Sequence, residues 1–205
     1  RLQRRGGKGV SGGTLKDDED FVAKVFTATN HQYLLIFSNF GKVYWLKVYE
    51  IPEASRVSRG RALANVLSLE AEEHISEVIP VREFLDDQFL LMATAQGQVK
   101  KTALSAYGNP RAGGIKGIKL ADTDKLVDVV ITHGNDEILI ASDDGQACRF
   151  NETDCRPMGR DTGGVVGIDL SPGAQVVSLL RLEPGTEVLT ICARGFGKRT
   201  PFEEY

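Results

Sequence analysis

The sequence contains an internal repeat of about 50 residues, which limits the possible folds more than any other feature. Each copy has a short apolar segment, such as Leu90–Ala93, that is followed four residues later by a glycine. A second glycine, with a cation or another glycine beside it, recurs in phase with the first. The first series comprises Gly41, Gly97, Gly145 and Gly195, and the second comprises Gly6, Gly60, Gly114 and Gly164. Two series in phase indicate four copies of one structural unit.

Within a unit the pattern is that of β-strands, as the third copy shows most clearly. Residues 115–120 alternate between Ile and Lys, 126–132 are rich in Val and Ile, 138–142 are apolar, and 146–150 follow the turn at Gly145. This pattern predicts four short strands per unit, with a glycine hairpin between the last two.

Four such units fill the chain as a single domain, with approximate boundaries at 1–55, 56–109, 110–158 and 159–205. An α-solenoid also has repeats of this length, but no segment keeps a 3.6-residue apolar period over about 12 residues. The hydrophobic content of 41% is enough for a core, and the 22 glycines favour many turns. The sequence therefore predicts an all-β, propeller-like fold of four-stranded antiparallel blades.

The charge pattern leaves room for an anionic partner. The formal net charge is -3, which taken alone argues against nucleic acid. Cations nevertheless gather around the glycine segments, while acids such as Asp17, Asp18, Glu72 and Glu73 follow in the connections. A basic surface is possible on such a molecule if the fold sends the two sets to different faces.

The three cysteines, Cys148, Cys155 and Cys192, form no C-x-x-C pair, which favours a reducing compartment and a cytoplasmic location. No apolar run has the length of a membrane helix, and we expect no membrane partner. The first residue is Arg, so we expect the chain to be a piece of a longer protein.

The segment Gln3–Gly9 reads Gln-Arg-Arg-Gly-Gly-Lys-Gly, with three cations and no acid. Its glycines would let the backbone approach a phosphate chain closely, so it is a candidate anion-binding loop. A flexible linker is the alternative, but a linker would not recur in phase along the chain. Residues 7–12 also match G-x-G-x-x-G, yet no strand is expected before them and no helix after them, which argues against a dinucleotide site.

Basic residues of the later units extend this candidate interface. Four residues past each turn glycine stand Trp45, Lys101, Arg149 and Arg199, and strand alternation would turn one member of each basic pair outward. Solvated edge charges that block aggregation are the alternative, and Trp45 is expected to pack. Ten residues past the glycines, Ile51, Tyr107, Cys155 and Tyr205 are expected to pack between blades. The basic candidates are Arg56, Arg59, Arg61, Lys100, Lys101, Arg111, Lys116, Lys119, Arg149, Lys198 and Arg199.

No catalytic or metal site is expected in this chain. None of the five tyrosines has the arginines and acids that a DNA-cleaving tyrosine needs nearby. The histidines His31, His74 and His133 lack partners at metal-ligand spacing, and no G-x-x-x-x-G-K-[ST] phosphate loop occurs. We expect no cofactor here.

Five basic or glycine-rich motifs are spread along the whole chain: Gln3–Gly9, Arg59–Arg61, Val99–Thr102, Arg156–Arg160 and Gly197–Thr200. Together they resemble the C-terminal domain of the DNA gyrase A subunit. This family has a six-bladed β-pinwheel whose blades exchange strands, whereas four units are present here.

The resemblance implies a DNA-wrapping function. Duplex DNA would bend around a basic outer rim so that the ATP-dependent type II topoisomerase introduces negative supercoils. Arg4, Arg5 and Lys8 would contact phosphates, while Gly6, Gly7 and Gly9 would shape the loop. Implied partners are double-stranded DNA, the cleavage domain of the gyrase A protein and the gyrase B protein in an A2B2 holoenzyme, with ATP and Mg bound elsewhere in that holoenzyme.

Two other functions stay open. One is that of the related topoisomerase IV C-terminal domain, which binds DNA without strong wrapping and whose Gln3–Gly9 equivalent is degenerate. The other is a protein-binding propeller, which the acidic pI of about 5.7 favours.

Overall fold

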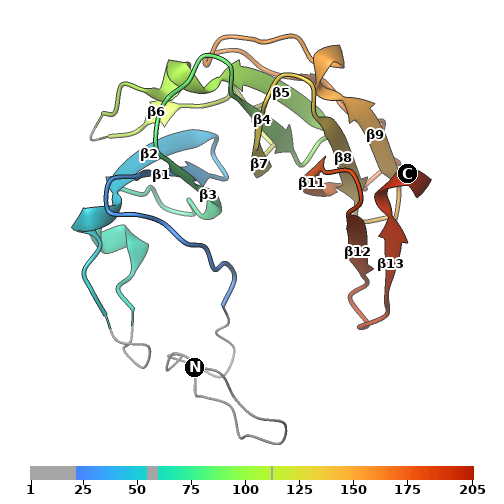
Figure 1. The fold of residues 1–205 in the computed structure, drawn as a ribbon, viewed down its shortest axis with the longest axis horizontal. Helices are drawn as coiled ribbons and strands as arrows, with labels where there is room; N and C mark the ends of the chain where they lie inside the picture. The colour runs from blue at the N-terminus through green and yellow to red at the C-terminus, as the bar shows by residue number, and fades with distance from the viewer. Residues whose placement is uncertain (1–21, 55–59, 112) are drawn as a thin grey trace, which may run out of the picture.

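The computed structural model describes residues 22–54, 60–111 and 113–205. These residues form thirteen β-strands and five short 3-10 turns, and small antiparallel sheets follow one another along an arc (Figure 1). The 3-10 turns are η1 (Val48–Glu50), η2 (Leu63–Asn65), η3 (Leu104–Tyr107), η4 (Glu152–Asp154) and η5 (Phe202–Glu204). The all-β prediction is confirmed.

One hairpin occurs in each predicted unit, with its turn at the expected glycine. Gly41, Gly97, Gly145 and Gly195 all have positive φ angles, between 71° and 89°, which glycine adopts without a Cβ penalty. The hairpins are β1 (Tyr33–Ser38) with β2 (Lys42–Lys47), β4 (Phe89–Thr94) with β5 (Gln98–Ala103), β8 (Glu137–Ser142) with β9 (Ala147–Asn151), and β12 (Glu187–Ile191) with β13 (Gly197–Pro201).

The other strands precede the hairpins and differ in length. Three of them have seven residues each: β3 (Ile75–Val81), β7 (Leu126–Thr132) and β11 (Val176–Leu182). Two have only two residues each: β6 (Ile115–Lys116) and β10 (Val165–Val166). The third and fourth units thus contain the predicted four strands, in the order short strand, long strand and hairpin. The second unit departs from the prediction, because its described residues 60–74 contain η2 but no short strand before β3.

The strands of one unit do not lie in one sheet. The sheet orders are β3-β1-β2-β6, β10-β5-β4-β7, β11-β8-β9 and β12-β13. Each four-stranded sheet therefore combines a hairpin with the long strand of the next unit and the short strand of the unit after that. A blade is built from three consecutive units, which is the exchange of strands that the family resemblance implies.

The core lies between neighbouring sheets and is therefore shared by units. The largest cluster joins Leu35 and Phe37 of β1 to Leu90 and Met92 of β4, together with Tyr107 after β5. A second cluster continues through Leu91, Ile140 and Cys155 to Leu179 of β11. Burial of Tyr107 and Cys155 confirms their expected packing role. Tyr205 packs beside Phe202, whereas Ile51 is 42% exposed and departs from the expectation.

Glycines of the second series seat the short strands against the hairpins. A Cβ on Gly114 would lie 2.9 Å from the Tyr44 ring, and one on Gly164 would lie 2.5 Å from the Val99 carbonyl oxygen. Both distances are too short for a real side chain, so only glycine allows β6 and β10 to approach the hairpins this closely. Gly60 has no such neighbour within 4 Å.

Candidate nucleic-acid interface

Two glycine-rich loops run along the convex side of the arc (Figure 1). The first, here called the 113–120 loop, includes β6, and the Gly117 N–H donates to the Gly41 carbonyl at 2.7 Å. The second, the 156–170 loop, includes β10, and the Gly167 N–H donates to the Gly97 carbonyl at 2.8 Å. Each loop is thus fixed to the turn of a hairpin two units earlier. The Lys119 N–H also donates to the Thr162 carbonyl at 3.0 Å, so the two loops contact each other.

Cations of these loops are available to a ligand. Lys116, Lys119 and Arg156 are exposed, as is Arg111 just before the first loop, and Arg160 is half-buried. None of the five forms an ion pair within 4 Å with another described residue. By contrast, Arg149 is paired with Glu137 and Arg199 with Glu187. Arg111 and the 113–120 loop therefore present only positive charges, whereas Arg156 and Arg160 of the 156–170 loop are accompanied by the exposed acids Asp161 and Asp169.

The prediction that Lys100 contacts DNA is wrong. Its side chain is fully buried, and its ammonium donates to the Gly117 carbonyl at 2.7 Å and to the Arg160 carbonyl. Burial lowers the pKa of this ammonium to about 8 because the charged form loses its hydration, and the nearby Asp161 carboxylate only partly offsets that loss. Lys100 is a structural residue beneath the two loops.

Lys101 is also buried, on the other face of β5, and its predicted DNA contact is wrong too. Its ammonium lies 2.7 Å from a Glu152 carboxylate oxygen. That carboxylate also accepts hydrogen bonds from the Thr132 hydroxyl and from the N–H groups of Gly134 and Asp136, at 2.7 to 2.9 Å. Burial opposes ionisation of Glu152, but these donors outweigh it and lower the pKa of its carboxyl.

The position four residues past the turn glycine joins each of the first three hairpins to the next unit. Trp45 Nε1 donates to the Tyr107 carbonyl at 2.9 Å, and Lys101 pairs with Glu152. The Arg149 guanidinium lies 4.4 Å from the Phe202 ring centroid, and only 30% of this side chain is accessible. Trp45 packs as expected, whereas Lys101 and Arg149 serve contacts between units rather than a free outer surface.

The remaining predicted residues divide into two groups. Arg61, Lys198 and Arg199 are exposed, the last two on β13, while Lys116, Lys119 and Arg111 belong with the outer loops. Gln3, Arg4, Arg5, Gly6, Gly7, Lys8, Gly9, Arg56 and Arg59 lie outside the described residues, so their roles stay predictions.

Arg156 and Arg160 were absent from the set of candidate residues, although both belong to the outer loops. A signal for Arg160 exists in the sequence, because it stands four residues before Gly164 as Arg56 stands four residues before Gly60. Arg156 has no such counterpart in the repeat.

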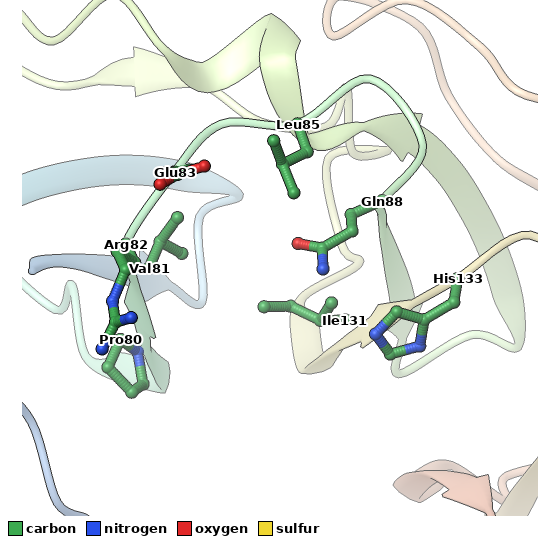
Figure 2. A pocket seen from close by; sticks show the side chains of 8 residues that line it. All are labelled: Pro80, Val81, Arg82, Glu83, Leu85, Gln88, Ile131 and His133. Carbon is green, nitrogen blue, oxygen red and sulfur yellow. The ribbon is translucent and has the colours of Figure 1, made fainter.

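The opposite edge of the first two sheets carries a separate pocket. Figure 2 shows its lining side chains between the ends of β3 and β7. The volume of the pocket is about 470 Å³. Its lining includes Val81, Arg82, Gln88, Ile131 and His133. Because β3 and β7 lie at the sheet edges away from β6 and β10, the Arg82 charge belongs to a different surface from the outer loops.

Two other kinds of site are absent from the part of the chain that the structure describes. Within those ranges, no three His, Cys, Asp or Glu side chains gather where they could hold a metal ion. No helix there is long and apolar enough to span a membrane.

Comparison with known proteins identifies the family. The family model described as DNA gyrase C-terminal domain, beta-propeller, matches residues 1–29, 32–82, 88–133 and 136–183. The chain is 46% identical over 203 residues to the DNA gyrase A protein of Salmonella typhimurium, covering 99% of the chain and 23% of that protein. It is 41% identical to the same gyrase protein of Neisseria gonorrhoeae, with 100% of the chain and 27% of that protein covered. The chain thus spans about a quarter of the length of these relatives.

Solved structures show the same relationship. A DNA gyrase A C-terminal domain superposes with a TM-score of 0.78 at 29% identity, covering 99% of this chain and 65% of that one. The C-terminal domain of a DNA topoisomerase IV gives a TM-score of 0.78 at 30% identity, covering 86% and 55%. With its repeated hairpins, exchanged strands and basic outer loops, the chain belongs to the DNA gyrase C-terminal domain family of β-propellers.

Proposed function

We propose that this chain binds duplex DNA along its convex rim and bends it, as the wrapping domain of a DNA gyrase A protein. The observation that carries the proposal is that Lys116, Lys119, Arg156 and Arg160 of the outer loops form no ion pair with another described residue, together with the position of these loops on one curved side of the molecule. Cations that have no acidic partner nearby are the groups that neutralise phosphates and release counterions.

Binding is expected to depend on the DNA backbone rather than on base sequence. The cations stand on glycine-rich loops and not on a helix or ribbon that fits the major groove. Duplex DNA is stiff, with a persistence length of about 150 bp, so bending it around a domain costs several kcal/mol. Contacts spread along the rim must offset that cost. Several weak phosphate-binding sites along the rim therefore stabilise wrapped DNA better than one strong site.

Within a holoenzyme this wrapping would supply the geometry for supercoiling. We infer that the cleavage domain of the gyrase A protein and the gyrase B protein complete an A2B2 type II topoisomerase that introduces negative supercoils. ATP and Mg would bind in those other parts, and no cofactor is assigned to this chain. Two of the three free thiols, Cys148 and Cys192, are at least partly accessible, which supports a reducing cytoplasm as its compartment.

Salt titration of duplex binding tests the proposal. The logarithm of the affinity should fall with the logarithm of salt with a slope of roughly -5 or steeper, at about -0.9 per phosphate neutralised. The variant Lys116→Ala/Lys119→Ala should make this slope shallower by about 1.8. The control, Arg82→Ala, removes an exposed cation just after β3, at the sheet edge opposite to the outer loops, and should leave the slope unchanged. A flat salt response of the parent chain contradicts the proposal.

The Gln3–Gly9 segment calls for a separate experiment in the holoenzyme. Replacing Arg4, Arg5 and Lys8 with Ala should weaken duplex binding modestly, because the cations of the outer loops remain. Supercoiling of relaxed plasmid should be lost, while relaxation or decatenation persists. Supercoiling equal to that of the parent would show that this segment is a linker.

A topoisomerase IV-type role is the second candidate, because the structural similarity to that C-terminal domain is equally high. In that role the chain would bind DNA without strong wrapping. Supercoiling by a holoenzyme that contains this chain favours the gyrase role, and decatenation without supercoiling favours the alternative.

A further inference from the structure

The Lys100 ammonium is buried with no described carboxylate within 4 Å, although Asp161 acts on it from a longer distance. Burying a charge is costly unless hydrogen bonds compensate it, so a lysine at such a position calls for an explanation. The equivalent residues, three past each turn glycine, are Tyr44, Cys148 and Lys198, so the fold does not require a buried cation here.

Both acceptors of this ammonium belong to the outer loops, and they come from different units. The Gly117 carbonyl lies between Lys116 and Lys119 in the third unit, and the Arg160 carbonyl lies in the fourth. The Tyr107 hydroxyl donates to the same Gly117 carbonyl at 3.1 Å, which fixes that peptide further. One buried side chain thus fixes two cation-bearing segments at once.

The first unit lacks this arrangement. Tyr44 directs its hydroxyl to both carboxylate oxygens of Glu73, at 3.0 and 2.9 Å, and to the Ser68 carbonyl at 3.5 Å, so all of its partners lie in the second unit. The link between loops is therefore specific to the position that carries Lys100.

We propose that Lys100 is a positioning residue that couples the two outer loops, so that Lys116, Lys119 and Arg160 act as one phosphate-binding site that spans two units. This inference rests on the proposed DNA-binding function. Lys100 itself does not touch DNA. It sets the spacing of the cations that contact phosphates. This spacing matters because a stiff duplex cannot adjust to binding sites that move independently of each other.

The test combines Lys100→Met with the double variant Lys119→Ala/Arg160→Ala, here called the loop variant, in the full chain. Methionine fills most of the buried volume but cannot hold the two carbonyls. In Lys100→Met, the phosphate contacts of Lys116, Lys119 and Arg160 should no longer form together. The salt slope of duplex binding should therefore become shallower by up to about 2.7. After Lys100→Met, adding Lys119→Ala/Arg160→Ala should cost little further affinity, whereas the same pair should cost about tenfold or more in the parent background. A mere loss of stability would not produce this non-additivity.

Leu182→Ala is the control for stability, because Leu182 is buried in β11 at a different sheet from the outer loops. It should lower the unfolding temperature and leave the salt slope unchanged. If circular dichroism shows that Lys100→Met is unfolded, Lys100→Gln, which keeps a donor group, takes its place and should give an intermediate slope.

The outcomes separate the two claims. A flat salt response of the parent chain overturns the proposed function itself. A steep parent slope that Lys100→Met or its substitute leaves unchanged, with additive effects of the loop variant, overturns only the positioning role.

Discussion

The ammonium nitrogen of Lys101 and a carboxylate oxygen of Glu152 lie 2.7 Å apart, with both side chains buried between the second and third units. Lys101 stands on the hairpin of one unit and Glu152 in the 3-10 turn of the next. The pair therefore joins neighbouring units from inside, where solvent does not screen it.

Removing one member of this pair should destabilise the chain strongly. Lys101→Met leaves the Glu152 carboxylate buried without its cation, and breaking a buried pair in this way costs about 3–5 kcal/mol. The double variant Lys101→Met/Glu152→Leu removes both charges and should recover most of the loss. Urea unfolding monitored by circular dichroism measures both. Equal destabilisation by the single and double variants would contradict this account.

Tyr44→Phe should reduce stability in a pH-dependent way. Burial opposes ionisation of Glu73, but the Glu70 N–H and hydroxyl donors including Tyr44 hold the pKa of its carboxyl below the usual value. A lowered carboxyl pKa adds stability above the unfolded value of 4.5, and this stability is lost as pH falls through the folded pKa.

The phenylalanine variant should lose about 1.5–3 kcal/mol at about pH 7, the contribution of a hydrogen bond to a charged group. It should also show a smaller stability change than the parent between about pH 7 and about pH 3. Tyr49→Phe alters an exposed hydroxyl and is the control. Identical pH profiles for Tyr44→Phe and the parent would refute the role given to this hydroxyl.

Two turn glycines allow backbone strain to be separated from close packing. Gly97 and Gly145 have φ angles of 84° and 89°, so alanine at either should cost about 1–2 kcal/mol. A Cβ on Gly97 would also lie 2.7 Å from the Ile168 carbonyl oxygen, whereas Gly145 has no neighbour within 4 Å. Gly97→Ala should therefore cost about 1–3 kcal/mol more than Gly145→Ala in thermal unfolding. Equal costs would argue that the 156–170 loop is not seated on this turn.

Lys100 should titrate with a pKa of about 8, because burial removes hydration from its charged form. Between that pH and the usual value of 10.5 the unfolded chain binds more protons than the folded chain, so this group makes stability rise with pH in that window. NMR detection of the lysine ε-methylene signals checks the value. The signal that titrates in this range should be missing from Lys100→Met, and its persistence there would contradict the assignment.

The sequence was sufficient to predict the four hairpins with their turns and the four strands of the third and fourth units, because those depend on local patterns. Gly41, Gly97, Gly145 and Gly195 stand between apolar segments, and each forms a hairpin turn with positive φ. The local sequence pattern could not predict which strands pair with each other. Nothing local to Ile115 and Lys116 indicates that they pair with β2 of the first unit rather than with their own hairpin.

The same limit explains the two wrong site residues. Strand alternation correctly put Lys100 and Lys101 on opposite faces of β5. The expectation that one face is open to solvent was wrong, because the outer loops cover the Lys100 face and the Glu152 turn covers the Lys101 face. Burial of a lysine depends on which segments of other units lie over it, and this information resides in the tertiary structure.

Duplex DNA is proposed to follow the convex rim, and the most direct test is the topology of plasmid closed in the presence of the chain. Nicked plasmid is bound, ligated and freed of protein, so that any wrap remains as a change in linking number. The parent chain should shift the topoisomer distribution in proportion to the amount bound. The rim variant Lys116→Ala/Lys119→Ala/Arg160→Ala should abolish that shift, while the control Arg82→Ala retains it. An unshifted distribution with the parent chain at saturating concentration, or a full shift with the rim variant, would contradict the account.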